Sequence, residues 1–442
     1  MAFDFRPRRG AFDFRSKPAT GGTLAFQRDL EIYVGIDFGT TFSKVSFQVG
    51  DQEGTTKYSI RFGYHGKDED YCLPSVLGYN PQSRTLIFTQ NPEKLDGVVP
   101  VKYFKYSMIE KGVPRDVDDL KEGRAENDPQ RLCSAFYLGH LLRNVKETIL
   151  EHKAVKGRYK SIRWYVNMGV PVSDFAAKPK PVYDEALNVA WQLSELEVLD
   201  TSCRIDILDR FYSKWIDHST WSDRLNTVPE LYAEIIMFLQ AKTTDSGFYA
   251  VIDIGGGTMD LAIFMKRIDM YKHETDIYCV AQDVCPLGYE MYRLVHDQKV
   301  ANKKIRLSYA ECLEHGRQNH KREMQDLFIK GGLLEQFYMG GARDVAVYHD
   351  IIKDTDTDYV NSWVQYPGCT EKNILDFMRG RFNLEVTKNS RLVISQMLAQ
   401  PFEKMPPLTG QEWNKGIRIQ GQTPSLQDLQ DHLYGLDNGC TN

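Results

Sequence analysis

The chain alternates between short apolar runs, which are typical of strands, and longer stretches in which apolar residues recur at helical spacing. Residues 31–47 and 248–264 each hold an apolar run, a turn rich in glycine and threonine, and a second apolar run. This pattern predicts two β-hairpins. Residues 129–153 keep one apolar helical face, and residues 162–171 read as a buried strand. An α/β fold is therefore expected.

Other segments follow the same two periodicities. We expect a strand–turn–strand unit around Asn80 and Pro81, and a helix that opens at Pro229, a favoured first position. A helix should also open just after Pro286. Residues 196–226, aromatic and charged without a clear period, are interpreted as an irregular insertion. The remaining expected elements are helices within 182–191, 302–328 and 390–400, a strand near 276–282, and a strand, a Gly-Gly pair and a helix within 336–351.

The two hairpin turns have the composition of an anion-binding loop. Glycine removes the Cβ and tolerates positive φ, so backbone amides can converge on an anion, and threonine hydroxyls add donors. An aspartate precedes each turn, Asp37 in the first and Asp253 in the second, and an aspartate beside a phosphate requires a bridging cation. The pair therefore predicts a Mg²⁺–nucleotide clamped from two sides. The candidate phosphate donors are Gly39, Thr40, Thr41, Gly255, Gly256, Gly257 and Thr258.

These two motifs also support a family resemblance. GIDFGTTFSKV is similar to the first phosphate motif of the actin-like ATPase superfamily, and DIGGGTMDLAIF to the second, with the DnaK-type chaperone branch nearest. The resemblance implies a two-lobed, ribonuclease H-like α/β fold with mixed five-stranded sheets flanked by helices, and nucleotide in the cleft between the lobes. It places the lobes at residues 31–245, completed by a helix at 389–401, and at 246–388. The chain has no room for a chaperone's peptide-binding domain within residues 406–442.

The resemblance also implies roles for individual residues. Gly340, Gly341 and Arg343 resemble the adenosine motif of the superfamily, with a small subdomain beside it. ATP or ADP with Mg²⁺ would be the cofactors. Asp37 and Asp253 would be both metal-binding and catalytic, and Asp260 would be a further metal-side ligand.

Three positions concern catalysis and depart from the chaperone pattern. Chaperone-like relatives carry Glu-Pro where this chain has Val228-Pro229, so the usual glutamate is absent. Glu230 or Glu234 could replace it by facing the cleft, and a solvated helix position is the alternative for each. Lys94, Lys102 and Lys105 lie in the region of the catalytic lysine, and Lys105 is the preferred candidate. Lys44, seven residues after Asp37 as in actins, would point over the phosphates or face solvent.

Composition excludes some other classes. Net charge of −5 and the lack of a basic stripe argue against nucleic-acid binding, and no apolar run approaches the roughly 20 residues of a membrane span. Eight scattered cysteines without a CxxC pair indicate a cytoplasmic protein with reduced thiols. Cys312, His315 and His320 lie within nine residues, but their spacing on a helix favours a structural role over a metal site.

Both ends are interpreted as tails, residues 1–30 and 402–442. The first contains a repeat, because residues 2–6 and 11–15 both read AFDFR, which suggests docking on a protein partner. The resulting hypothesis is a slowly hydrolysing, chaperone-like ATPase that acts as a conformational switch. The alternatives are an actin-like filament former, a small-molecule kinase of the same fold, and a nucleotide-binding protein without turnover.

Overall fold

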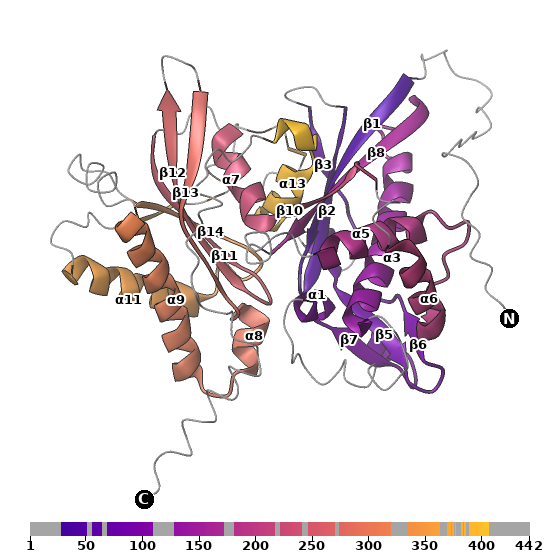
Figure 1. Cartoon of the computed structure of the whole chain (residues 1–442), viewed down its shortest axis with the longest axis horizontal. Helices are drawn as coiled ribbons and strands as arrows, with labels where there is room; N and C mark the ends of the chain where they lie inside the picture. The colour runs from indigo at the N-terminus through magenta and orange to yellow at the C-terminus, as the bar shows by residue number, and fades with distance from the viewer. Residues whose placement is uncertain are drawn as a thin grey trace, which may run out of the picture.

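The computed structural model describes most of the chain from Arg28 to Met405. The described residues are 28–50, 55–63, 69–108, 128–171, 181–216, 222–240, 246–269, 274–319, 334–362, 369–372, 374, 376, 382, 384–385 and 389–405. Within them the fold is mixed α/β, with sheets flanked by helices (Figure 1). The AFDFR repeats and most of the C-terminal segment lie outside the described residues.

The first sheet is built around β1, which begins at Arg28, three residues before the predicted boundary. It has the order β10-β8-β1-β2-β3, and the two-residue strand β4 pairs with β2. β1 is antiparallel to β2 and parallel to β8, and β10 is parallel to β8. The strands are β1 (Arg28–Phe38), β2 (Phe42–Val49), β3 (Lys57–Ser59), β4 (Leu73–Pro74), β8 (Tyr159–Val170) and β10 (Leu225–Pro229).

The second sheet repeats this topology. Its order is β13-β12-β11-β14-β15, in which β11 is antiparallel to β12 and parallel to β14, and β14 is parallel to β15. β11 therefore corresponds to β1, and β12 to β2. The strands are β11 (Gly247–Ile254), β12 (Met259–Asp269), β13 (Glu274–Cys285), β14 (Leu334–Met339) and β15 (Cys369–Lys372). Both predicted hairpins are confirmed.

Helices cover the outer face of each sheet. α3 (Pro129–Glu151), α5 (Pro181–Ser194) and α6 (Ile205–Trp215) enclose one core with the first sheet. Asp128 caps α3 by accepting a hydrogen bond from the Gln130 amide. α8 (Tyr289–Leu294), α9 (Gln298–Asn319) and α11 (Ala346–Ser362) enclose a second core with the second sheet. α11 begins three residues later than predicted.

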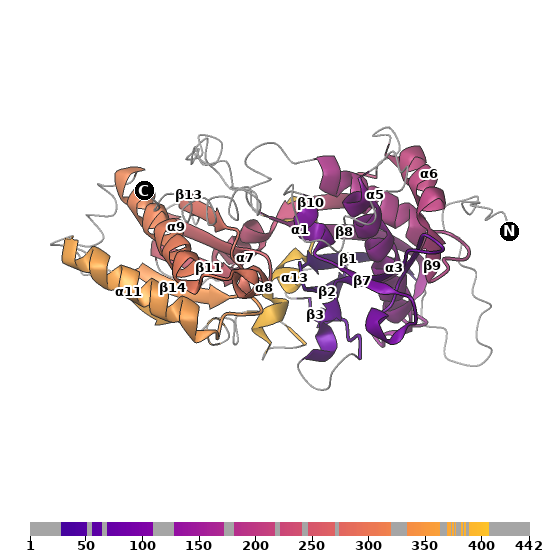
Figure 2. The same cartoon turned by 90° about the horizontal axis from the view of Figure 1, so that it is seen from below.

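Two helices lie between the sheets in both views (Figures 1 and 2). α7 (Glu230–Gln240) and α13 (Val393–Leu398), with side chains of the second sheet, form a third apolar cluster. α13 also packs on the first sheet: a Cβ at Gly35 of β1 would lie 2.2 Å from the Ser395 carbonyl oxygen. The helix expected at 390–400 therefore forms, preceded by the 3₁₀ turn η5 (Ser390–Leu392), and packs beside the first sheet as predicted.

A third, antiparallel sheet was not predicted. Its order is β7-β5-β6-β9, with β5 (Val76–Asn80), β6 (Thr85–Ile87), β7 (Val99–Lys102) and β9 (Ser202–Arg204). The β5–β6 hairpin confirms the turn expected at Asn80 and Pro81. The irregular insertion expected at 196–226 is wrong, because this segment contains β9, α6 and the first two residues of β10. Short elements remain: α1 (Phe104–Ser107), η1 (Glu69–Tyr71), η2 (Pro92–Lys94) and η6 (Phe402–Lys404).

Candidate functional site

A pocket of about 1120 Å³, partly open to solvent, lies where the two hairpin turns face each other. Both turns, α7, the Gly340-Gly341 loop and the start of α13 contribute to its wall. Every predicted site residue except Arg343 lines it. The lining also includes residues that the sequence did not indicate: Phe42, Cys72, Tyr289, Glu290, Met339, Ala342, Arg391, Val393 and Ile394.

The tips of the two turns are in close contact across this pocket. A Cβ at Gly256 would lie 2.0 Å from Thr41 Oγ1, and one at Gly257 would lie 2.7 Å from Thr40 Oγ1. Side chains at these glycines would therefore force the turns apart. Glycine here is required by the close approach of the two halves, and it leaves backbone amides of both turns at one place.

In the first hairpin the aspartate is paired with a lysine. The strand register places Asp37 opposite Lys44, and Lys44 Nζ donates to Asp37 Oδ2 at 2.8 Å. Burial lowers the pKa of Lys44, but the Asp37 carboxylate outweighs this effect, so the pKa lies above its ordinary value. The pair is almost enclosed, with side-chain exposures of 12% for the lysine and 6% for the aspartate. Lys44 therefore points into the pocket and does not face solvent.

In the second hairpin the same register places Asp253 opposite Asp260. Burial, followed by the nearby Glu230 and Asp37 carboxylates, raises the pKa of Asp253 to about 7. Burial and the Asp253 charge raise the pKa of Asp260 well above its ordinary value. Thr258 Oγ1 donates to Asp260 Oδ2 at 3.0 Å, whereas Oδ1 of both aspartates is buried and accepts no hydrogen bond from the described residues. These oxygens are oriented for a ligand or a proton.

α7 brings two further carboxylates close to the acids of the second hairpin: Glu230 lines the pocket, and Glu234 is buried within range of the charges of Asp253 and Asp260. Glu230 and Glu234 are buried, so their interpretation as solvated residues is wrong. The reason is that α7 is apolar on every side and lies between the two sheets. Burial and the charges of Asp253 and Asp260 raise the pKa of Glu234 well above its ordinary value. The second hairpin and α7 thus form one cluster of acids.

Glu230 is held by the predicted catalytic lysine. Lys105 Nζ donates to Glu230 Oε1 at 2.6 Å, and both side chains are more than 90% enclosed. Burial raises the pKa of Glu230, and the lysine opposes this shift. Tyr103, at φ 60°, turns the backbone just before the short helix α1, which presents Lys105 to the pocket. Two residues 125 positions apart in sequence are brought together here.

The predicted adenosine loop is built around Gly340, at φ +82°. A Cβ there would lie 2.1 Å from Asp253 Oδ1, so only glycine fits, whereas one at Gly341 would meet no atom within 4 Å. Arg343 does not line the pocket; it is paired with Asp344 on the surface. Arg391 of η5 lines the pocket instead and donates to the Gly341 carbonyl oxygen at 3.3 Å.

The donor set suits a metal–phosphate group more than a bare metal ion. Among the described residues no group of three His, Cys, Asp or Glu side chains could hold a metal ion, and this includes Cys312 and His315. Magnesium commonly keeps several waters and binds through one or two carboxylates together with phosphates, so Asp37 and Asp253 would suffice. Amides of the glycine turns and the buried, unpaired Thr41 Oγ1 are available for the phosphates.

Comparison with protein family models gave no match, and comparison with curated protein sequences gave none. Function is therefore argued from geometry. No helix among the described residues is long and apolar enough to cross a membrane.

Proposed function

We propose that the chain is an actin-like ATPase of the chaperone-like branch, which binds Mg²⁺–ATP in this pocket, hydrolyses it slowly and acts as a conformational switch for a partner. The main supporting observation is the duplication. Two sheets of the same topology bring equivalent hairpins together, so that Asp37 and Asp253 line one pocket. The two halves of this arrangement would be the lobes of the actin-like fold.

The turns would bind the phosphates. Gly39 and Thr40 in one turn, and Gly256 and Gly257 in the other, line the pocket, and their backbone amides would donate to the phosphates. The Gly255 amide already donates to the Thr258 carbonyl oxygen at 2.9 Å. A phosphate chain held by both turns would fix their separation. The Gly340-Gly341 loop leaves open space above Gly341 against which the nucleoside can lie. Magnesium, held by Asp37 and Asp253 through water, would neutralise phosphate charge.

Asp253 is suited to receive a proton. In hydrolysis a water oxygen bonds to the terminal phosphorus, the bond to the bridging oxygen breaks, and the proton of the water must go to a base. Asp253 would be this base, because its Oδ1 is buried in the wall of the pocket and accepts no hydrogen bond from the described residues. Glu234 and Asp260, beside it, would hold protons and so limit the charge of the cluster.

Lys105 would stabilise the negative charge on the transferred phosphate. Its ammonium is held by Glu230, so no ordering of a flexible side chain is required when nucleotide binds. Glu230 would therefore compensate for the missing Glu-Pro glutamate from two residues further along the chain, as a positioning residue for Lys105.

The test is thermal unfolding with and without 1 mM Mg²⁺–ATP, together with phosphate release. If the dissociation constant is a hundredfold below the ATP concentration, binding stabilises the fold by about 2.7 kcal/mol. Asp37→Ala should abolish this stabilisation, and Lys105→Ala should keep binding while lowering turnover on the order of a hundredfold. Asp344→Ala, on the surface, is the matched control. Unchanged unfolding in ATP would refute the proposal.

The second candidate is nucleotide binding without turnover, favoured by the Lys44–Asp37 ion pair. An ammonium at 2.8 Å from Asp37 competes with magnesium for that carboxylate. In this case ATP would stabilise the chain equally with magnesium or with EDTA. Lys44→Met would then make the stabilisation by ATP depend on magnesium. If the parent protein hydrolyses ATP, its stabilisation already depends on magnesium before any substitution.

A further inference from the structure

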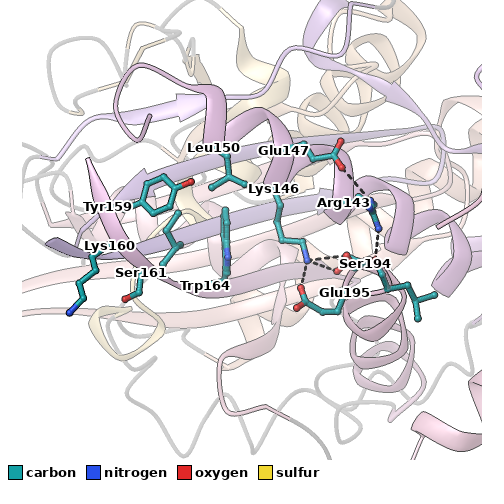
Figure 3. Close-up of a pocket in the computed structure, with 12 residues that line it drawn as sticks. Arg143, Lys146, Glu147, Leu150, Tyr159, Lys160, Ser161, Trp164, Ser194 and Glu195 are labelled. Atoms are coloured by element: carbon teal, nitrogen blue, oxygen red, sulfur yellow. Dashed lines mark hydrogen bonds and ion pairs between the residues drawn. The ribbon is translucent and has the colours of Figure 1, made fainter. Parts of the chain in front are cut away.

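A second pocket, of about 670 Å³, lies at the other end of the first sheet from the candidate site (Figure 3). Asp37 lies at the carboxyl end of β1, whereas this pocket is lined by the opposite, amino-terminal end of the parallel strand β8. The apolar part of its lining is Leu150, Tyr159, Ile162 and Trp164, with charged groups at its edge: Arg143, Lys146, Glu147, Lys160 and Glu195. An apolar floor with a charged edge is typical of a peptide-binding site.

The lysine inside this pocket is fixed in place. Lys146 Nζ donates to Ser194 Oγ at 2.7 Å, pairs with Glu195 and lies 4.4 Å from the centre of the Trp191 ring. Burial lowers its pKa, and Glu195 opposes the shift. Because this cation is already neutralised, the pocket favours apolar side chains in its interior. At the edge, Lys160 is exposed, and Glu147 is paired with Arg143 at 3.2 Å.

The strand beside the pocket has an unpaired edge. β10 pairs with β8 only along Val166–Val170. Of the described residues, none pairs with the same edge of β8 between Tyr159 and Tyr165. Backbone N–H and C=O groups therefore face outward directly beside the pocket. An extended peptide can add to such an edge, with its alternate side chains entering neighbouring pockets.

The chain itself contains a segment of this chemistry. In each AFDFR repeat two phenylalanines are two residues apart, so an extended conformation would place both on one face and the aspartate on the other. The repeats are close by along the chain, because β1 starts beside the pocket. Arg28 is paired with Tyr159, and Ser161 Oγ donates to Asp29 Oδ1 at 2.6 Å. Twelve residues, 16–27, separate the second repeat from β1. They can span up to about 40 Å.

We propose that the free edge of β8 binds an AFDFR repeat of the same chain as an added strand, with its two phenylalanines in the pocket floored by Ile162 and Trp164. The repeats are thereby held away from any partner until the edge is released. This inference does not depend on nucleotide binding.

The test is hydrogen exchange of the full chain, read at the amides of residues 160–165. Phe3, Phe5, Phe12 and Phe14 are all replaced by serine in one variant. Exchange at alternate amides of this stretch should become at least tenfold faster, while exchange in α3 stays unchanged. Phe26→Ser, outside the repeats, is the matched control and should exchange like the parent.

A composition-preserving variant tests the alternation. Asp4→Phe with Phe5→Asp, and Asp13→Phe with Phe14→Asp, keep the residues but place the phenylalanines on opposite faces. It should exchange as fast as the serine variant. A fluorescein-labelled Ala-Phe-Asp-Phe-Arg peptide should bind the serine variant at least tenfold more tightly than the parent, whose edge is occupied.

Three results would overturn the proposal. One is equal exchange in the parent and the serine variant. The second is protection retained by the composition-preserving variant. The third is protection that rises with protein concentration, which would mean that a second copy of the chain supplies the repeat. Loss of ATP binding in any variant bears on the proposed function and leaves these readings unchanged.

Discussion

The two hairpin regions share a backbone and differ in charge. Both place the residue seven positions after the aspartate directly opposite it, but this residue is Lys44 in the first hairpin and Asp260 in the second. One region is therefore a neutralised ion pair, and the other is a cluster of acids with raised pKa values. Equivalent backbone position does not imply equivalent chemistry: the first aspartate is paired with a cation, whereas the second lies among further carboxylates.

The largest effect is expected at the one glycine where both strain and contact apply. Gly340→Ala would place a Cβ 2.1 Å from Asp253 Oδ1 at a positive φ, which should cost roughly 2–4 kcal/mol of unfolding free energy. Gly341→Ala, whose Cβ meets no atom within 4 Å, should cost less than about 1 kcal/mol. Urea denaturation of both variants measures the difference. Equal losses would contradict the packing described around Asp253.

The next effect tests the ion pair that connects α1 with α7. Lys105→Met leaves the buried Glu230 without its partner and should destabilise the fold by roughly 3 kcal/mol. Adding Glu230→Gln to this variant should recover part of the loss, since no unpaired charge remains. The measurement is a double-mutant cycle in denaturant, and additive losses would show that the two side chains do not interact.

The acid cluster predicts a pH dependence of opposite sign to that of an ordinary ion-paired carboxylate. Asp253 has a pKa of about 7 in the folded chain, above its ordinary value of 3.8, so the folded state binds more protons. The contribution of this group to the free energy of unfolding is fully present below about pH 4. As the pH rises to 7, a few kcal/mol of unfolding free energy are lost. Asp253→Asn should flatten the fall in unfolding free energy between about pH 4 and 7. If the unfolding free energy fell with the same slope in both proteins, groups other than Asp253 would be responsible for the fall.

The smallest effect separates the two turn threonines. Thr41 Oγ1 is buried without a partner, so Thr41→Val should change the unfolding free energy by less than about 0.5 kcal/mol. Thr258→Val removes the hydrogen bond to Asp260 and should cost about 1 kcal/mol. Thermal unfolding without nucleotide measures both, and a larger loss for Thr41 would contradict the comparison. The Thr41 variant should keep its stability without nucleotide but lose part of the stabilisation by Mg²⁺–ATP. The Thr258 variant should not show this combination.

Much of the fold follows from periodicity, because long elements repeat their pattern often enough to be distinguished. α3 and the two hairpins are of this kind. The third sheet could not be predicted, since its strands have three to five residues and pair with segments far away in sequence. α6 was missed although it buries Ile205, Leu208 and Phe211 on one face, because its aromatic and charged residues obscured the period.

The candidate site was predicted where the motif is local and missed where tertiary packing decides. Glycines and aspartates of the turns lie where their spacing indicates, whereas the burial of Glu230 depends on which elements enclose α7. One signal was available: PELYAEIIMFLQ has no polar face, and a carboxylate in such a helix requires a partner. Nothing in the sequence distinguished Arg391 from Arg343.

The packing of α13 on β1 has a consequence for synthesis of the chain. Ser46 in β2 and Ser395 in α13 are joined by a hydrogen bond of 2.9 Å across 349 residues, and α13 also contacts β8. As the polypeptide leaves the ribosome, the inner face of the first sheet therefore stays without its cover until almost all of the described residues have been translated. Contacts so distant in sequence form slowly, and an exposed sheet invites chaperone binding. Nascent chains stalled before Val393 should consequently be protease-sensitive in β1, and those stalled well beyond it should be resistant.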